Sequence, residues 1–155
     1  MKMLHGVASD IPDNANALEI LLGRRLSSED SLDGFRHIES GFQLSDVVQA
    51  LLSLDVLKDK HVMTQIIGMP ASVLHRRSRD PERALDSIHS ERLFRFAVVS
   101  TRAANVFGDK QLAIEWMVKP ALGLEGYSPI ALLANNAGYD IVLSFLVRIE
   151  YGVYH

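Results

Sequence analysis

The stretch from Ser90 to His155 is divided by residues that start and stop helices, and this division constrains the fold more than any other feature of the sequence. A helix start favours a side chain that accepts a hydrogen bond from the first amides, and a helix stop favours glycine or a following proline. The expected starts are Ser90, Asp109, Ser128-Pro129 and Asp140, and the expected stops are Gly108, Pro120, Gly138 and Gly152. The stretch therefore predicts a series of short helices, the last of which runs to Tyr151.

Between these starts and stops, apolar side chains recur every three or four residues, which is the spacing of one helix face. The clearest examples are Leu93 and Phe96 in the first helix, Leu112 and Trp116 in the second, and Val142, Phe145 and Leu146 in the last. Trp116 can be a core anchor or an interface residue, and its helical spacing favours the core. We predict an all-α fold.

Composition narrows the classes of function. With 155 residues, of which 48% are hydrophobic and 23% charged, the chain can form one domain or two small ones. It has no apolar run of about 20 residues and no signal-peptide pattern, which predicts a cytoplasmic protein without a membrane partner. The absence of cysteine excludes disulfides and thiol chemistry, and the six histidines show no helical metal-ligand spacing. We therefore expect no metal, no cofactor and no enzymatic activity.

A basic segment in the middle of the chain predicts a DNA-binding element. Residues 58–83 carry six basic and three acidic side chains, whereas residues 1–57 carry four and nine. Gly68-Met69-Pro70 separates two short helical patterns, as in a helix-turn-helix. The second helix would present Ser72, His75, Arg76, Arg77 and Arg79, and arginine can bind guanine or phosphate through two hydrogen bonds. The alternative is a solvated basic face; the preceding turn and the local charge favour DNA.

Two further helices are expected nearer the N-terminus. Asp13 or Asn14 can start one that carries Leu18 to Leu22, and Ser45-Asp46 can start another that runs to about Leu54. The first is amphipathic enough for a homodimer contact, which the short reach of one helix-turn-helix also favours. Asp80-Pro81 is a natural boundary. We predict an N-terminal region over 1–85, with its helix-turn-helix at about 42–79, packed on a C-terminal domain over 86–155.

Several motifs in the last third of the chain stand in a consistent order. They are Ala104 to Asp109 (ANVFGD), Ala113 to Trp116 (AIEW) with Pro120, Leu124 to Gly126 (LEG) with Ser128-Pro129, Gly138, and Leu146 to Tyr154 (LVRIEYGVY). Together they resemble the toxin-binding domain of the Xre/MbcA/ParS-type antitoxins. The paired Arg76-Arg77 and the segment Ser90 to Leu93 are also similar to this family, which extends the resemblance roughly from Phe42 to the C-terminus.

The resemblance implies a function for the C-terminal end. In antitoxins of this kind that end blocks the active site of a partner toxin, typically a RES-domain enzyme that consumes NAD or a related ADP-ribosyltransferase, and the helix-turn-helix represses the operon. Here the expected toxin-binding residues are Arg148, Tyr151, Gly152, Val153, Tyr154 and His155. An exposed aromatic and a carboxylate at a rigid helix end suit a concave partner site. Val153 can instead fold back on the last helical turn.

Two other functions stay open at this point. The first is a helix-turn-helix transcription regulator whose C-terminal domain binds a small ligand or another protein, and a toxin gene beside this one would distinguish the two readings. The second is a small helical enzyme, which would need a polar cleft lined by carboxylates or histidines with shifted pKa values. The antitoxin reading, with a RES-domain toxin and operator DNA as partners, accounts for both the basic segment and the aromatic tail.

Overall fold

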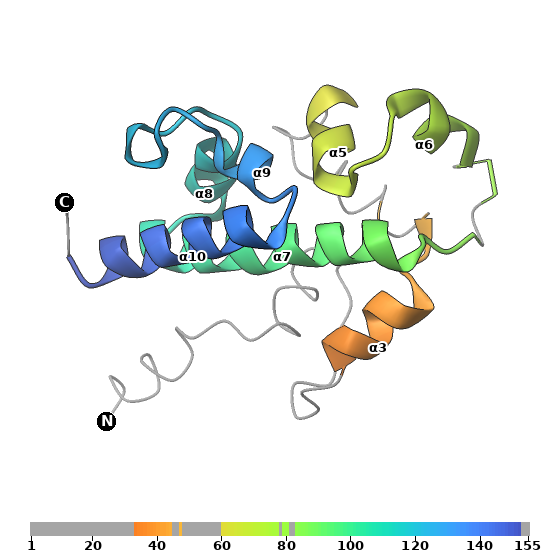
Figure 1. The fold of residues 1–155 in the computed structure, drawn as a ribbon, viewed down its shortest axis with the longest axis horizontal. Coiled ribbons are helices and arrows are strands. Elements are labelled where there is room, and N and C mark those ends of the chain that lie inside the picture. The colour runs from red at the N-terminus through yellow and green to blue at the C-terminus, as the bar shows by residue number, and fades with distance from the viewer. Residues whose placement is uncertain (1–32, 45–46, 48–59, 78, 81–82, 153–155) are drawn as a thin grey trace.

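The computed structural model describes residues 33–44, 47, 60–77, 79–80 and 83–152. Within these ranges the protein is built from helices, and its extended pairing is limited to one isolated bridge between Gln43 and Ala84, so the predicted all-α class is confirmed. The elements are α3 (Asp33–Ser40), α5 (Lys60–Ile67), α6 (Ala71–Arg77), α7 (Ser87–Phe107), α8 (Lys110–Met117), η2 (Leu122–Leu124), α9 (Pro129–Leu132) and α10 (Asn136–Glu150) (Figure 1).

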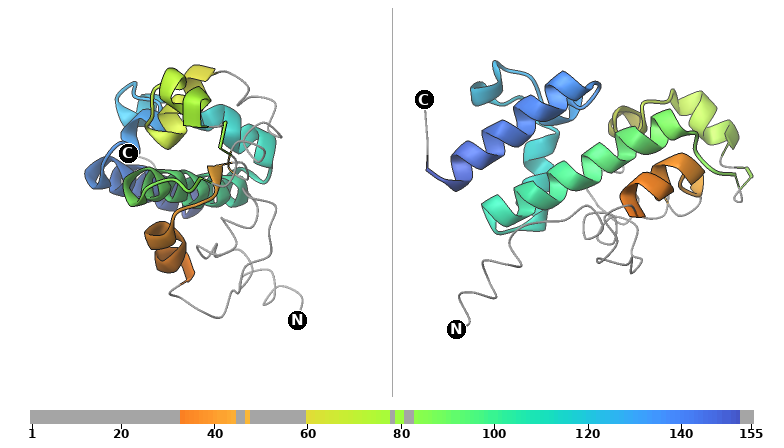
Figure 2. Two further views of the ribbon diagram at one scale, coloured as in Figure 1. Left: turned by 90° about the vertical axis from the view of Figure 1, so that its right-hand side faces the viewer. Right: turned by 60° about the horizontal axis from the view of Figure 1, so that its bottom comes forward.

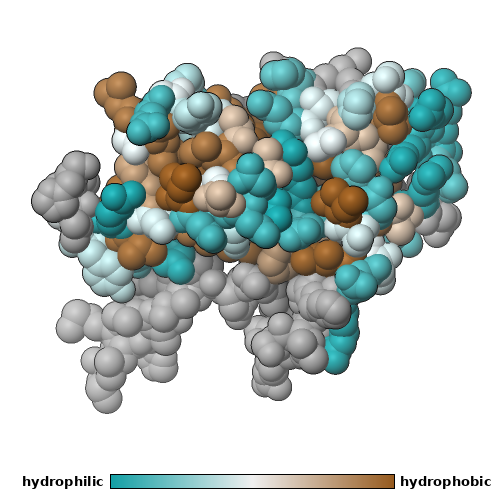
Figure 3. Space-filling view, in the orientation of Figure 1, coloured by the Kyte–Doolittle hydropathy of each residue, from teal (hydrophilic) through white to brown (hydrophobic). Residues whose placement is uncertain are grey.

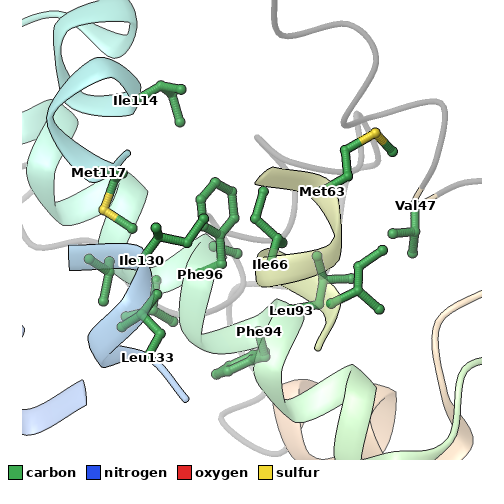
Figure 4. Packing of buried hydrophobic residues seen from close by; sticks show 14 of the residues in the cluster. Val47, Met63, Ile66, Leu93, Phe94, Phe96, Ile114, Met117, Ile130 and Leu133 are labelled. Atoms are coloured by element: carbon green, nitrogen blue, oxygen red, sulfur yellow. The ribbon is translucent and has the colours of Figure 1, made fainter. Parts of the chain in front are cut away.

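The 21-residue helix α7 is the element on which the others are assembled. It contacts α3, α5, α8 and α10, and Figures 1 and 2 show α10 running beside it. Its apolar side chains point into a single core, where Phe96 lies between Ile66 of α5 and Ile130 of α9, and Leu93 lies on the side of Ile66 (Figure 4). Burial of this face stabilises a helix whose own sequence is rich in β-branched and aromatic residues.

The start of α7 differs from the prediction. Asp86 is the N-terminal cap, because its Oδ1 accepts a hydrogen bond of 3.0 Å from the backbone amide of His89. The predicted start at Ser90 is wrong, since Ser90 lies inside the helix and is buried. Its Oγ accepts a hydrogen bond of 3.3 Å from the amide of Phe42 and donates one to the Leu85 carbonyl. Ser90 therefore joins α7 to the segment after α3.

The start of α10 also differs. The prediction has a helix ending at Gly138 and another starting at Asp140, whereas α9 ends at Leu132 and α10 begins at Asn136. Asn135 is the cap, and its Oδ1 accepts a hydrogen bond of 2.9 Å from the amide of Gly138. Gly138 is a packing residue, because a β-carbon there would collide with the backbone carbonyl of Leu132.

The other predicted boundaries in this part are confirmed. Gly108 adopts a left-handed conformation with φ of 74° and ends α7, and Asp109 caps α8 through the amide of Leu112. Ser128 caps α9 with Pro129 in its first turn, and α8 ends at Met117, before Pro120. These devices depend only on neighbouring residues, which is why the local sequence predicts them.

Some predicted features lie elsewhere or outside the described residues. The segment Asp33–Ser40 is a helix that the sequence did not predict, and it ends at Gly41, where φ is 81°. Leu112 was expected on the apolar face of α8 but is exposed. The helix expected around Leu18 to Leu22 lies outside the described residues, and of the helix expected to follow Ser45-Asp46 only Val47 is described. No helix in the described ranges is long and apolar enough to span a membrane.

Candidate functional site

At the C-terminal end of α10, backbone hydrogen bonds complete the last helical turn and several side chains are exposed. The amide of Tyr151 donates to the Val147 carbonyl at 3.1 Å, and the amide of Gly152 donates to the Ile149 carbonyl at 3.1 Å. Gly152 then turns the chain with φ of 70°. Tyr151 is 75% exposed and Arg148 is also exposed. Val153, Tyr154 and His155 lie outside the described residues, so three of the six predicted toxin-binding residues are placed on this end.

Ion pairs and hydrogen bonds to α7 fix the position of α10. Near its end, Glu150 pairs with Arg102 at 3.3 Å. Near its start, Arg95 donates to the Leu133 carbonyl and to Asn136 Oδ1, and it pairs with Glu91 at 3.0 Å. A planar guanidinium with several donors suits such a junction. The end of α10 is therefore held at a defined place on the protein body.

Apolar packing completes this attachment. Val142 and Leu146 of α10 are fully buried against the core. Tyr139 is partly buried beside them, and burial raises the pKa of its hydroxyl. The helix therefore keeps one face in the core and leaves its opposite face to solvent.

Trp116 anchors an aromatic column under this region. Its ring stacks on Phe145 of α10 with centroids 6.0 Å apart and 5° between the ring planes, and it meets Phe107 of α7 at 5.4 Å. Trp116 is half-buried and packs on the core cluster, so it is a packing residue of this domain, as its helical spacing favoured. Offset and tilted ring pairs of this kind add to the stability that area burial gives.

The basic residues of the second region lie on and just after α6. α5 and α6 are joined at Gly68-Met69-Pro70, and Gly68 has φ of 81°. The Nε of Arg92 in α7 donates to the Gln65 carbonyl at 2.8 Å and its side chain covers Gly68. This partial burial lowers the pKa of Arg92. Leu74 is the buried residue that holds α6 on the core. The two short helices and their turn therefore form as predicted.

The five predicted DNA-binding residues do not share one environment. Ser72, His75, Arg76 and Arg79 are exposed. Arg77 is half-buried, and its Nη1 lies 4.0 Å from Oδ2 of Asp86, the cap of α7. The Asp86 carboxylate accepts the His89 amide and lies beside the His89 ring and Arg77, and these contacts lower its pKa despite some desolvation. Arg77 thus connects α6 to α7, whereas Arg76 and Arg79 extend to solvent.

Comparison with known proteins finds a family match in the last third of the chain. Residues 102–152 match the antitoxin Xre/MbcA/ParS C-terminal toxin-binding domain. Residues 102–152 of this chain are therefore similar to the toxin-binding domain of that family. The matched range of the toxin-binding domain begins in the last part of α7 and includes α8, η2, α9 and α10. The resemblance inferred from the motifs is therefore confirmed, and the exposed end of α10 lies inside the matched range.

Two curated relatives carry the name Antitoxin Xre. The protein from Photorhabdus laumondii is 37% identical over 65 residues, which is 41% of this chain and 44% of the relative. The protein from Pseudomonas putida is 34% identical over 77 residues, which is 50% of this chain and 47% of the relative. In both cases the match spans less than half of the relative's length.

The sequence did not predict the residues that attach α6, the α5–α6 turn and α10 to α7. Asp86, Arg92 and Arg95 make the connecting contacts, and each bonds or pairs with residues that lie far along the chain or in another element. Only the cap at Asp86 has a local signal, because Asp precedes a helical pattern there. Within the described ranges, no group of three or more histidine or acidic side chains is placed to hold a metal ion.

Proposed function

We propose that this protein is the antitoxin of a type II toxin-antitoxin system, which neutralises a RES-type, NAD-consuming toxin by covering its active site. The match of residues 102–152 to a toxin-binding domain carries the proposal. The fixed end of α10 supports it, because Arg148 and Tyr151 extend from a helix that is braced on α7. Neutralisation would be steric: the segment Arg148 to His155, which starts on the fixed end of α10, fills a concave site and excludes the substrate without chemistry of its own.

The second part of the proposal is repression of its own operon through α5 and α6. Arg76 and Arg79 are exposed near the end of a short helix, where they can reach phosphates or base edges, and Ser72 lies near the start of the same helix. Cations at the C-terminal end of a helix are also favoured by its dipole, which helps to fold α6 itself. We propose operator binding as a homodimer in the cytoplasm, with residues 1–85 and 86–155 as its two functional parts.

Truncation of the C-terminal segment tests neutralisation. The protein encoded next to this chain in its operon is the probe, and its NAD consumption is measured with increasing amounts of antitoxin. A variant that lacks residues 152–155 should keep its melting temperature and lose at least about tenfold in inhibitory potency, because the core side chains stay in place. Ile88→Ala is the matched control, since Ile88 is 75% exposed on the first turn of α7, away from α10. Full inhibition by the truncated chain would exclude the segment as the blocking element.

Substitution of arginine tests the DNA-binding part. Arg76→Ala should weaken binding to a duplex from the promoter of the operon about tenfold or more, and the logarithmic salt slope should fall by roughly 0.9 for each phosphate that a protomer no longer neutralises. Lys119→Ala is the control, because Lys119 is an exposed cation near the end of α8. Sedimentation of the same samples measures the dimer. Equal DNA binding by both variants would contradict the role of α6, and a monomer at micromolar concentration would contradict the dimer.

A further inference from the structure

A second exposed surface lies beside the end of α10. It consists of Leu122 in η2 together with Ile141 and the solvent-facing part of Phe145 in α10, and we call it the η2 patch. Leu122 is 98% exposed and Ile141 is 49% exposed. In Figure 3 hydrophobic side chains gather on the side of the molecule where Figure 1 draws α10 and the loop before α9. A leucine that is almost fully exposed adds little to the stability of the fold.

The loop that carries Leu122 is closed by its own backbone. The amides of Leu124 and Gly126 donate to the carbonyl of Ala121 at 3.0 and 2.9 Å, and the amide of Ala121 donates to the carbonyl of Tyr127 at 3.1 Å. Leu124 is buried and attaches the loop to the core. Leu122 is therefore presented on a preformed turn, so little backbone entropy would be lost when a partner binds it.

The aromatic column supports this loop from below. A β-carbon at Gly123 would collide with the ring of Phe145, so the backbone of η2 lies directly on that ring. Phe145 in turn stacks on Trp116. Glu125, two residues after Gly123, has a left-handed backbone with φ of 56°, which is uncommon for a residue other than glycine. Such strain persists where the surroundings hold it in place, and it is often found at binding sites.

The η2 patch is continuous with the proposed toxin-binding end. Ile141, Phe145 and Arg148 follow one another at intervals of four and three residues, which places them on one face of α10. Tyr151 continues the row by one further step of three residues. Because Gly123 lies on Phe145, Leu122 stands beside the middle of this row. The row and the loop together make one surface that runs from η2 to the end of the helix.

We propose that the η2 patch is a second contact site for the toxin, at which Leu122 enters an apolar pocket next to the active site that the C-terminal segment covers. The inference rests on the proposed function. A toxin is the occupant that fits best, because the patch continues the row ending at Arg148 and Tyr151 and lies within the residues that match a toxin-binding domain. A preformed apolar anchor at the centre of a contact contributes strongly to affinity. The C-terminal segment supplies occlusion, and the η2 patch supplies affinity.

Binding of the operon-neighbour protein to the full chain tests this division. Leu122→Asp should raise the dissociation constant about tenfold or more, Ile141→Ser should raise it several-fold, and Ile88→Ser should leave it unchanged. Leu122→Asp and Ile88→Ser should keep the wild-type melting temperature, because Leu122 is 98% exposed and Ile88 is 75% exposed. Ile141→Ser should lower it slightly, because Ile141 is only 49% exposed. At concentrations that saturate binding, Leu122→Asp should still inhibit the toxin fully, whereas the chain without residues 152–155 should not.

The outcomes separate the inference from the function on which it rests. If the wild-type chain binds its neighbour and Leu122→Asp binds equally well, the η2 patch is not a contact site, while the proposed function stands. If Leu122→Asp instead abolishes a concentration-dependent dimer seen by sedimentation and leaves toxin binding unchanged, the occupant is a second copy and the inference is overturned. If the wild-type chain neither binds nor inhibits its neighbour, the proposed function itself fails.

Discussion

Two regions attach to the same helix, α7, in different ways: the C-terminal block, which consists of α8, η2, α9 and α10, and the region of α5 and α6. In the C-terminal block every described α-helix has a side-chain cap, and α10 is fixed to α7 by an ion pair at its end, a guanidinium junction at its start and two fully buried side chains between them. In the other region α6 has only seven residues and is held by Leu74, by the turn that Arg92 covers, and by the long contact between Arg77 and Asp86. The end of α10, which we propose blocks a toxin, is therefore held by more contacts than α6, which we propose binds DNA.

The largest expected effect comes from the core that both regions share. Phe96 of α7 is fully buried between α5 and α9, as Figure 4 shows. Phe96→Ala should lower the free energy of unfolding by about 3–5 kcal/mol, because it removes a large side chain and leaves a cavity. Chemical denaturation with fluorescence of Trp116 reports the C-terminal block, and circular dichroism reports all helices. In the wild type we expect the unfolding transitions measured by fluorescence and by circular dichroism to coincide. If Phe96→Ala unfolded only one of the two regions, the regions would be shown to fold independently.

A smaller effect is expected from Gly138, which belongs to the C-terminal block alone. In a helix, alanine is normally better than glycine by roughly 1 kcal/mol. Gly138→Ala should nevertheless destabilise the protein by about 1–3 kcal/mol, because the added methyl group would press on the Leu132 carbonyl. Thermal melting measures the change, and Ala137→Gly in the same turn is the control, with an expected cost of only about 0.5–1 kcal/mol. A stabilised Gly138→Ala variant would show that α9 and α10 are not in close contact.

The smallest effect tests the link between the two regions at Asp86. Asp86→Ala should cost about 1 kcal/mol through loss of the helix cap. The folded state lowers the pKa of this carboxyl below the ordinary value of 3.8, so its stabilisation is present above that pH and is lost as the pH falls through the lower, folded-state pKa. The difference in stability between wild type and Asp86→Ala should therefore shrink in acid. Asp86→Asn retains a neutral cap and should remove the pH dependence; a pH-independent difference for Asp86→Ala would contradict the charge contribution.

The same comparison explains how far the sequence could predict the structure. Gly108, Asp109 and Ser128-Pro129 were predicted correctly because their bonding partners lie within a few residues. Ser90 was assigned to the wrong role because its hydroxyl bonds to Phe42, which is distant in the sequence. Gly138 looks like a stop, but its small size is needed for contact with α9. In each case the sequence shows which interactions the side chain can make, but it does not show which distant residue is the bonding or packing partner.

The candidate site follows the same rule. Tyr151 could be predicted as exposed because it sits at a helix stop, and Arg76 because it lies on a short helix whose buried residue is Leu74. The half-buried position of Arg77 depends on where α7 begins, which the sequence placed incorrectly. Leu122 carries no local signal of exposure, since a leucine between two helices usually enters the core. Its exposure becomes evident only in the structure, where the backbone hydrogen bonds of the loop hold Leu122 away from the core.

The length of α7 has a consequence for how two partners can be bound together. An α-helix rises about 1.5 Å per residue, so a helix of this size spans roughly 30 Å, about the diameter of a small domain. Its first turn lies next to Arg77 of α6, and its last turns pair with the end of α10 through Arg102. The length of α7 therefore sets the distance between the surface of α6 and the end of α10. The two contact points on α7, Asp86 and Arg102, are separated by roughly 24 Å along the helix axis. The proposed DNA and toxin partners would therefore bind near opposite ends of α7.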